Sequence, residues 1–401
     1  MANSPLSRHW LLDPAVDFLN HGSFGACPRV VLENQREWAD RLERGPVRFL
    51  ARELEQHLDH VRAELGAFLD CHPDDLALVS NASAGLNTVL RSMQIEPGDE
   101  LVVTNHEYNA SANTLDFVAR RAGARLVVVE IPFPIDDPRA VCDLVLAAVT
   151  DRTRLVLIDH VTSQTGLVMP IEPLVRELRE RGVETMVDGA HGPGMVPLEL
   201  DALGAAYYTG NLHKWVCAPK GAAFLHVRRD LQSTVRPLTI SHGANSLRTD
   251  RSAFRIEADW IGTLDPSPWL AIPASLDFVR TVVPGGLHGL REHNRDLVLE
   301  GRRLLCEVLE VPEPAPESMI GSLASVPLPP SSVGPAANGC FEDPLHHALV
   351  ERGIEVPTMF WPKPPARLIR ISAQAYNHRP QYERLAAALG EILSGQSAPA
   401  G

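Results

Sequence analysis

Short runs of β-branched residues alternate with segments of helical length between about residues 75 and 230. Parallel strands need connections of a dozen or more residues, usually helical, so this alternation predicts a mostly parallel sheet covered by helices. The predicted strands are 76–79, 100–104, 126–129, 155–158, 185–187 and 223–227. The predicted helices between them are 84–94, 109–122, 138–149 and 171–181. The predicted fold class is therefore α/β.

Polar residues follow four of the predicted strands. They occupy the segments 80–83, 106–109, 160–164 and 188–191. In open α/β sheets, ligands bind beyond the carboxyl ends of the strands, so we expect these four segments to meet at one site.

The pattern changes after residue 270, where the sequence predicts a smaller α+β unit. Its predicted helices are 269–281, 287–310, 343–352 and 380–393. Its predicted strands lie near 354–356 and 368–371, after a proline-rich stretch, 311–338, that surrounds one short strand. The expected organisation is an N-terminal arm (1–20), a large α/β domain (21–275) and a small C-terminal α+β domain (276–401).

The composition limits the partners that we expect. The formal charge is −13, whereas nucleic acid and anionic membranes attract a basic face. No stretch has the length and apolarity of a signal core or a membrane span, so we expect a cytoplasmic protein that binds neither nucleic acid nor membrane. The cysteines lack metal-ligand spacing, so we expect reduced thiols and no metal site. They are Cys27, Cys71, Cys142, Cys217, Cys306 and Cys340.

Lys214 and Asp188 are the residues that indicate a chemistry. Asp188 ends a predicted strand, and Lys214 follows in the motif His213-Lys214-Trp215. A lysine amine condenses with the aldehyde of pyridoxal phosphate, and a carboxylate keeps the pyridine nitrogen of that cofactor protonated. Alone, the lysine would indicate a surface charge and the aspartate a helix cap. Together they predict a pyridoxal phosphate site.

The motifs, taken in chain order, resemble the class V aminotransferase superfamily of fold type I pyridoxal phosphate enzymes, and in particular its isopenicillin N epimerase-like branch. The resemblance runs from about residue 18 to 395 and implies a large domain with a mostly parallel sheet and a small C-terminal α+β domain. The motifs that carry it are 19–25 (LNHGSFG), 107–110 (EYNA), 188–191 (DGAH), 213–215 (HKW), 218–221 (APKG), 260–263 (WIGT), 370–372 (RIS) and 376–377 (YN).

The resemblance implies roles for three catalytic residues. Lys214 would carry the cofactor covalently and then remove or return the proton at the substrate α-carbon. Asp188 would face the pyridine nitrogen. Tyr108 would stack on the cofactor ring, with a buried core tyrosine as the alternative.

The resemblance also implies a phosphate site. Ala82 and Ser83 precede or begin a predicted helix, so their amides and the Ser83 hydroxyl would bind the phosphate at a helix N-terminus. Asn211 and His213 would add further contacts to the phosphate.

Four more residues follow from the same resemblance. His191 and Ser163 would approach the cofactor hydroxyl. Gly262 and Thr263 match a loop that in relatives crosses to the phosphate of the neighbouring subunit, which implies a twofold homodimer with shared sites. The alternative is that these two residues form an ordinary turn.

The expected substrate-binding residues lie in separate parts of the chain. Arg370 matches the arginine that binds a substrate α-carboxylate, although an arginine in a strand can instead face solvent. Asn20 and His21 would border the pocket, with a purely structural role as the alternative for His21. Arg48 and His242 are further pocket candidates without an assigned role.

The sequence leaves the reaction open, because loss of an α-proton can be followed by several outcomes on this cofactor. Cysteine desulfurases use a cysteine on a mobile loop, but the matching stretch here, 353–359, contains none, and Cys340 is the nearest. Segment 20–25 also resembles that of hercynylcysteine sulfoxide lyases. We therefore favour C–S β-elimination on an S-substituted cysteine in secondary or sulfur metabolism, since a thiolate leaves without strong acid assistance and Lys214 suffices as base.

Four alternatives remain. Epimerisation requires a proton donor on the face opposite Lys214, for which Tyr108, His21 and His242 are candidates. Transamination and decarboxylative oxidative deamination of cysteine S-conjugates are two further reactions. The non-enzyme alternative is a binding protein that kept the fold without the cofactor, and the pairing of Lys214 with Asp188 argues against it.

Overall fold

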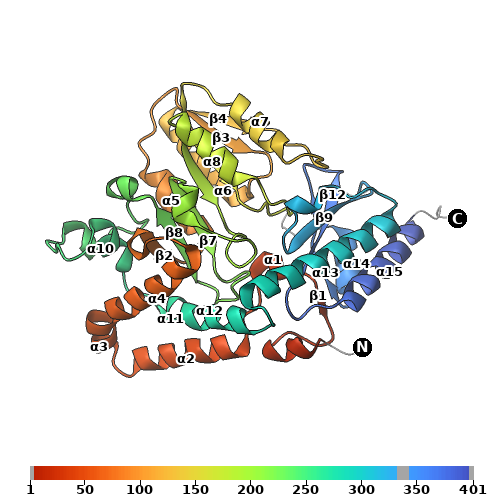
Figure 1. Cartoon of the computed structure of the whole chain (residues 1–401), viewed down its shortest axis with the longest axis horizontal. Helices are drawn as coiled ribbons and strands as arrows, with labels where there is room; N and C mark the ends of the chain where they lie inside the picture. The colour runs from red at the N-terminus through yellow and green to blue at the C-terminus, as the bar shows by residue number, and fades with distance from the viewer. Residues whose placement is uncertain (1–3, 332–342, 397–401) are drawn as a thin grey trace.

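The computed structural model describes residues 4–331 and 343–396, and its centre is a seven-stranded sheet (Figure 1). The strand order is β2-β8-β7-β6-β5-β3-β4, and every neighbouring pair is parallel except the two that involve β8. The predicted α/β class is confirmed. The strands are β2 (Leu76–Val79), β3 (Glu100–Thr104), β4 (Arg125–Val129), β5 (Thr153–Asp159), β6 (Glu184–Asp188), β7 (Tyr207–Asn211) and β8 (Ala223–Val227).

Helices cover both faces of this sheet, and all four predicted crossover helices are present. They are α5 (Ala82–Ser92), α6 (Asn109–Ala122), α7 (Arg139–Ala147) and α8 (Ile171–Glu180). Along β3, Leu101 and Val103 belong to the core on the side of α5 and α6. Val102 belongs to the core on the other side, which contains α7 and α8. Strands buried on both faces in this way read as continuous apolar runs, which is why the sequence identified them.

Two long N-terminal helices were not predicted. They are α2 (Arg29–Glu43) and α4 (Leu54–Leu69), connected through α3 (Pro46–Arg48) and the π-helical turn η2 (Phe49–Glu53). Both contact α11 (Ser267–Leu270) and α12 (Ile272–Thr281), as Figure 1 shows. The sequence had predicted one helix over 269–281, but α11 and α12 are separate helices that meet at Ala271.

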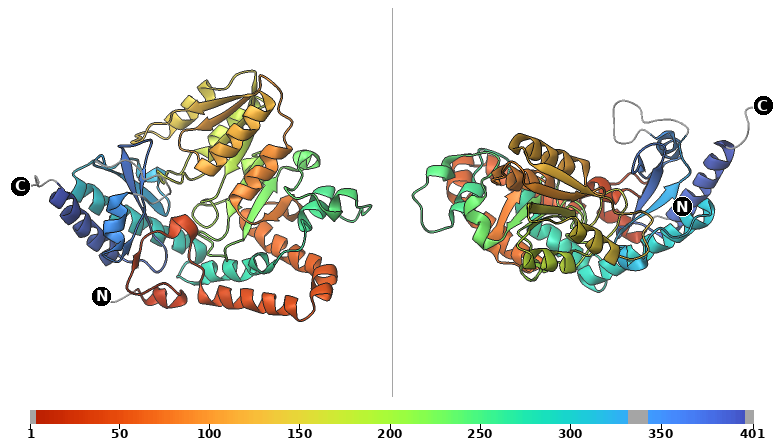
Figure 2. Two further views of the ribbon diagram at one scale, coloured as in Figure 1. Left: turned by 180° about the vertical axis from the view of Figure 1, so that it is seen from behind. Right: turned by 90° about the horizontal axis from the view of Figure 1, so that it is seen from above.

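A three-stranded antiparallel sheet forms the centre of the C-terminal unit, in the order β11-β12-β9. Figure 2 shows this unit (blue) at one end of the molecule, close to the N-terminus. β11 was not predicted. The strands are β9 (Leu323–Leu328), β11 (Thr358–Phe360) and β12 (Arg367–Ser372), and the helices are α13 (Gly286–Leu309), α14 (Pro344–Val350) and α15 (Arg379–Gln396).

The N-terminal arm joins the C-terminal unit. β1 (Asp17–Phe18) pairs in parallel with β10 (Ile354–Glu355), and Trp10 packs against Phe278 and Tyr376. The predicted domain boundaries stay a prediction. Cys340 and the end of the predicted proline-rich stretch, 332–338, lie outside the described residues.

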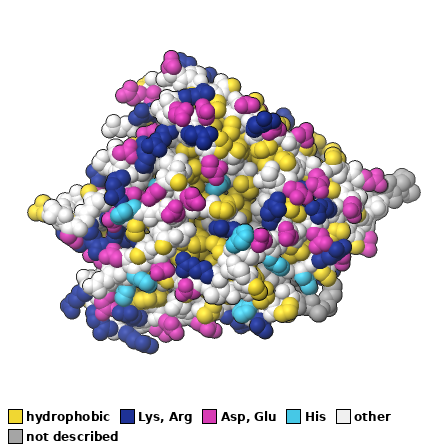
Figure 3. Space-filling model, viewed as in Figure 1, with side chains coloured by type: hydrophobic (Ala, Val, Ile, Leu, Met, Phe, Trp, Pro, Cys, Tyr) yellow, Lys and Arg dark blue, Asp and Glu magenta, His cyan; other side chains and the backbone are white. Residues whose placement is uncertain are grey.

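The surface gives no sign of a basic stripe on the face seen in Figure 3, where Lys and Arg side chains alternate with Asp and Glu. Among the helices in the described part of the chain, none combines the length and the apolar character that crossing a bilayer requires.

Candidate active site

The carboxyl ends of several strands meet at one edge of the large sheet. The amide of Ala82, just after β2, donates to Oδ1 of Asn211 at the end of β7 over 2.8 Å. The hydroxyl of Ser111 in α6, which follows β3, donates to Asp188 at the end of β6 over 2.9 Å. The amide of His160 donates to the carbonyl oxygen of Asp188, and the carboxyl group of Glu107 lies near that of Asp188, so three of the four predicted segments (106–109, 160–164 and 188–191) meet here, while 80–83 contacts the end of β7.

Lys214 lies at the centre of this edge and is only 9% exposed. Its Nζ is 2.9 Å from Nε2 of His191. Burial, together with the positive charge of Arg370, lowers the pKa of Lys214 to about 7, although Asp188 and Asp159 act in the opposite direction. An amine with this pKa is substantially neutral at physiological pH, as a nucleophile or a base must be.

Asp188 is a buried carboxylate held by two neutral donors. Its Oδ1 accepts a hydrogen bond from the amide of Ala190 at 3.0 Å, and its Oδ2 accepts the bond from Ser111. It forms no ion pair with any described residue. Burial raises its pKa, whereas the hydrogen bonds from Ala190 and Ser111 and then the charge of Lys214 act in the opposite direction. Such a carboxylate suits a protonated ring nitrogen, which would complete its charge balance.

The start of α5 fits a phosphate, although not with all the contacts that were predicted. The amide of Ala82 donates to Oδ1 of Asn211, so this amide is not free for a phosphate, which corrects the prediction for Ala82, while the predicted contact from Asn211 stays a prediction. The amide and hydroxyl of Ser83 form no hydrogen bond with any described residue, and Nδ1 of His213 is buried without a partner among them. A helix N-terminus with unused donors is a suitable anion site.

Arg370 is a buried cation without a carboxylate partner among the described residues. It donates to the carbonyl oxygen of Ser163, to Oγ of Ser23 at 2.9 Å and to Oδ1 of Asn20 at 3.5 Å. At 3% exposure it does not face solvent, so that alternative is excluded. A buried guanidinium with only neutral partners is ready to bind an anion such as a substrate carboxylate. Ser163 and Asn20 lie beside it.

Tyr108 is 45% exposed, so it is not the buried core tyrosine of the alternative interpretation. It immediately precedes α6, and its phenol interacts electrostatically with Arg370. The ring therefore lies on the open side of the site, where stacking on a cofactor is possible.

His21 has the contacts of a structural residue, which was one of its two predicted roles. It is fully buried, its Nδ1 lies 2.8 Å from the Tyr376 hydroxyl, and its Nε2 lies 2.9 Å from the carbonyl oxygen of Lys214. Burial lowers its pKa to about 3. With both ring nitrogens occupied, it anchors the backbone of Lys214. The backbone of Gly25, at φ +70°, lies close to the backbone of His213. Only glycine fits there, because a Cβ would lie 1.9 Å from the His213 carbonyl oxygen.

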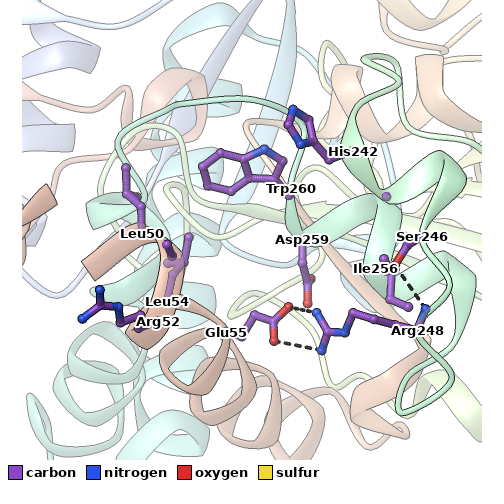
Figure 4. A pocket seen from close by; sticks show the side chains of 12 residues that line it. Leu50, Arg52, Leu54, Glu55, His242, Ser246, Arg248, Ile256, Asp259 and Trp260 are labelled. Carbon is purple, nitrogen blue, oxygen red and sulfur yellow. Dashed lines mark hydrogen bonds and ion pairs between the residues drawn. The ribbon is translucent and has the colours of Figure 1, made fainter. Parts of the chain in front are cut away.

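Arg48, His242 and the 262–263 loop do not join this cluster within one chain. Arg48 is exposed and pairs with Glu53 at 3.2 Å. Figure 4 shows His242 beside Trp260 on a different groove of about 230 Å³, across from Leu50 and Arg52. Gly262, at φ +113°, and the exposed Thr263 follow Trp260 in the loop after α10 (Ala253–Asp259).

Sequence reasoning missed four residues that shape the site. Trp215 donates to Nδ1 of His191 at 3.2 Å, and Ser111 donates to Asp188. Glu107 and Asp159 lie beside Asp188. A signal existed for Asp159, because it ends a predicted buried strand just as Asp188 does, but strand register was needed to place the two together.

Comparisons with known proteins identify the family. The model of the family described as aminotransferase class-V matches residues 19–298. An isopenicillin N epimerase of Amycolatopsis lactamdurans is 36% identical over 95% of this chain and 96% of its own length. A probable chloroplastic L-cysteine desulfhydrase of Arabidopsis thaliana is 31% identical over 97% of this chain and 85% of its own.

A solved structure supports the fold. It is a variant of C-DES with glycine covalently linked to the PLP cofactor, and it has a TM-score of 0.76 at 21% identity over 94% of this chain and 96% of that one. The family, the fold type and the epimerase-like resemblance predicted from the sequence are confirmed. The chain belongs to the class V aminotransferase family of pyridoxal phosphate-dependent enzymes.

Proposed function

We propose that this enzyme catalyses C–S β-elimination on cysteine or an S-substituted cysteine, with Lys214 as the base. The reaction removes the α-proton, breaks the bond between Cβ and sulfur, and releases hydrogen sulfide from cysteine or a thiol from an S-substituted cysteine. Addition of one water to the remaining fragment gives pyruvate and ammonia. The observation that carries the proposal is the neutral amine of Lys214 beside His191 at the reacting centre, because elimination of a thiolate requires this base and no second proton donor.

Pyridoxal phosphate, when bound, supplies a protonated ring that accepts the electron pair left at the substrate α-carbon. Asp188 would hold the ring nitrogen, Ser83 and His213 would bind the phosphate, and Tyr108 would lie against the ring. His191 would approach the cofactor hydroxyl. The unused donors and buried charges of these residues support each assignment.

Arg370 would bind the substrate α-carboxylate and so orient the Cα–H bond toward Lys214. Its neutral partners, Ser23 and Asn20, hold the guanidinium in place without neutralising it. A bound carboxylate would also shield Lys214 from the positive charge of Arg370, which raises the basicity of the amine when substrate is present.

Epimerisation is the second candidate, supported by the isopenicillin N epimerase relatives. It needs a donor on the face opposite Lys214. Within one chain, His21 is excluded because both its nitrogens are occupied, and His242 lies on another groove, from which it would serve only the site of a partner. Tyr108 remains, with an exposed phenol near Arg370. We prefer elimination because this chain places the base that it requires at the site, whereas epimerisation also requires a second proton donor.

The deciding experiment uses the cofactor-loaded enzyme with L-cysteine, a series of S-substituted cysteines, and a peptide that carries an α-aminoadipyl end. Elimination predicts equimolar thiol and pyruvate. Epimerisation predicts solvent deuterium at the α-carbon of both stereoisomers and no pyruvate. Oxygen uptake together with carbon dioxide release would instead identify decarboxylative oxidative deamination. Enzyme that releases no pyruvate from any of these substrates contradicts the proposal.

Matched lysine variants provide the control. Lys214, Lys220 and Lys363 are the lysines of the chain. Lys214→Ala is expected to lose the yellow colour of the loaded enzyme, its borohydride-sensitive absorbance and all turnover. Lys363→Ala, at an exposed position, is expected to retain all three.

We also propose a homodimer in the cytoplasm. The 262–263 loop, Arg48 and His242 lie away from Lys214 in their own chain, which is the arrangement expected of residues that serve the site of a partner. Sedimentation of the loaded enzyme tests this directly, and a monomer with full activity would refute it.

A further inference from the structure

Three buried carboxyl groups lie together at the cofactor site. One oxygen from each of Glu107, Asp159 and Asp188 lies within 4.8 Å of the other two. Asp159 and Asp188 end neighbouring parallel strands and are paired in register, while Glu107 follows β3 on the other side of β5. None of the three is more than 6% exposed.

The hydrogen bonds of the three groups differ. Asp188 is satisfied by Ser111 and Ala190. In contrast, three carboxyl oxygens receive no hydrogen bond from a described residue. They are both oxygens of Glu107 and Oδ2 of Asp159. Burying carboxylate oxygens without donors is costly. A single proton bound between Glu107 and Asp159 makes one carboxyl group a hydrogen-bond donor to the other.

The surrounding charges do not balance three carboxylates. Lys214 acts electrostatically on Asp159 and Asp188, but its own pKa is only about 7. The charge of Asp188 also acts on the Tyr208 phenol. This phenol stays protonated because burial raises its pKa. Burial and the neighbouring carboxyl groups raise the pKa of both Glu107 and Asp159. Three buried negative charges at this separation do not coexist at neutral pH.

We propose that Glu107 and Asp159 share one proton and act as a positioning pair beside Asp188. The pair retains one negative charge. Together with the charge of Asp188, it favours the protonated form of the cofactor ring nitrogen. The pair does not touch the substrate, so this inference holds whichever reaction the enzyme catalyses.

The first test detects the proton. A protonated carboxyl group has an infrared carbonyl band that a carboxylate lacks. We expect this band in the loaded wild-type enzyme at neutral pH, and we expect Glu107→Gln to lose it, because the amide then donates to Asp159. A spectrum without the band in the wild type, or a band that persists in Glu107→Gln, overturns the proposal.

Glu100→Gln is the matched control. Glu100 begins β3, whereas Glu107 follows the end of that strand. The hydrogen bond from Thr150, and then that from Arg125, lowers the pKa of Glu100. It is therefore a carboxylate already, and its replacement is expected to leave the infrared band unchanged.

The second test measures the charge. Glu107→Gln keeps a negative charge at Asp159, whereas Glu107→Gln combined with Asp159→Asn removes it. We expect the single variant to bind pyridoxal phosphate like the wild type and the double variant to bind it about tenfold more weakly, equivalent to one pKa unit. A cofactor analogue with carbon in place of the ring nitrogen should bind all three proteins equally. Equal loss of both ligands would indicate a purely structural role and overturn the proposal.

Discussion

Nε2 of His191 lies 2.9 Å from Nζ of Lys214, and this contact fixes the protonation of both groups. Burial lowers the pKa of His191 well below its usual value, so the ring is neutral. Since Nδ1 accepts the hydrogen bond from Trp215, the single ring hydrogen lies on Nε2. A lysine that faces this hydrogen must offer a lone pair. The geometry therefore favours the neutral form of Lys214, the amine that attacks an aldehyde or removes a proton.

The pH dependence of cofactor capture follows from this arrangement. Because the pKa of Lys214 is lowered to about 7, the amine is charged below that pH and neutral above it. We expect the rate at which the apoenzyme captures pyridoxal phosphate to rise with pH through a midpoint near 7, measured by stopped-flow absorbance. A midpoint near 10.5, the ordinary value for lysine, would contradict the assignment.

Trp215→Phe tests the role of the indole hydrogen bond. The variant keeps most of the ring volume but leaves Nδ1 of His191 without its donor, so the tautomer that faces Lys214 is no longer fixed. We expect α-proton exchange with solvent deuterium to slow about tenfold, equivalent to one buried hydrogen bond of about 1 to 2 kcal/mol.

The control is Trp269→Phe. Trp269 is also buried and donates from its indole to a carbonyl, that of Val79, at 3.2 Å. We expect a similar loss of stability with an unchanged exchange rate. If both variants exchange equally slowly, the effect comes from packing and not from the His191 tautomer.

Arg370→Met tests substrate binding and electrostatics together. Loss of charge-assisted hydrogen bonds worth about 1.5 to 3 kcal/mol is expected to raise KM about 10- to 100-fold. Because the charge of Arg370 lowers the pKa of Lys214, the pH midpoint of cofactor capture should move upward in this variant.

Arg370→Lys separates the two effects. It keeps the charge but loses the planar fork, so we expect a raised KM with an unchanged pH midpoint. A normal KM in Arg370→Met would refute the carboxylate-binding role.

Buried histidines predict how stability depends on acid. Burial lowers the pKa of His21 to about 3 and those of His106, His160 and His213 to about 4, whereas an unfolded histidine titrates near 6.5. Below pH 6.5 the unfolded state therefore binds more protons than the folded state. The free energy of unfolding should fall as the pH drops from 6.5 toward 4.

Urea unfolding at a series of pH values measures this slope. His106→Asn removes one such group, so the slope should become shallower by up to about 1.4 kcal/mol per pH unit. A slope in His106→Asn equal to that of the wild type would show that His106 is not held neutral.

The local sequence was sufficient where one element carries its own signal. The strands of the parallel sheet were predicted because burial on both faces leaves uninterrupted apolar runs, as in β3 and β5. β7 was missed because it ends in Gly210 and Asn211, residues depleted from strands, and its pairing with β6 and β8 decides its conformation. The helices α2 and α4 precede the alternating pattern and were not recognised.

The sequence by itself determined the family, the fold class and the pairing of Lys214 with Asp188, because these follow from motif order and from periodicity along the chain. Only the tertiary structure decided that His21 supports the Lys214 backbone, that Asn211 bonds Ala82, and that the partners of Arg370 within the described residues are the neutral groups of Ser163, Ser23 and Asn20. The protonation of a buried group depends on burial and on neighbours hundreds of residues away. Burial and spatial neighbours exist only in the folded chain, so they cannot be read from the linear sequence.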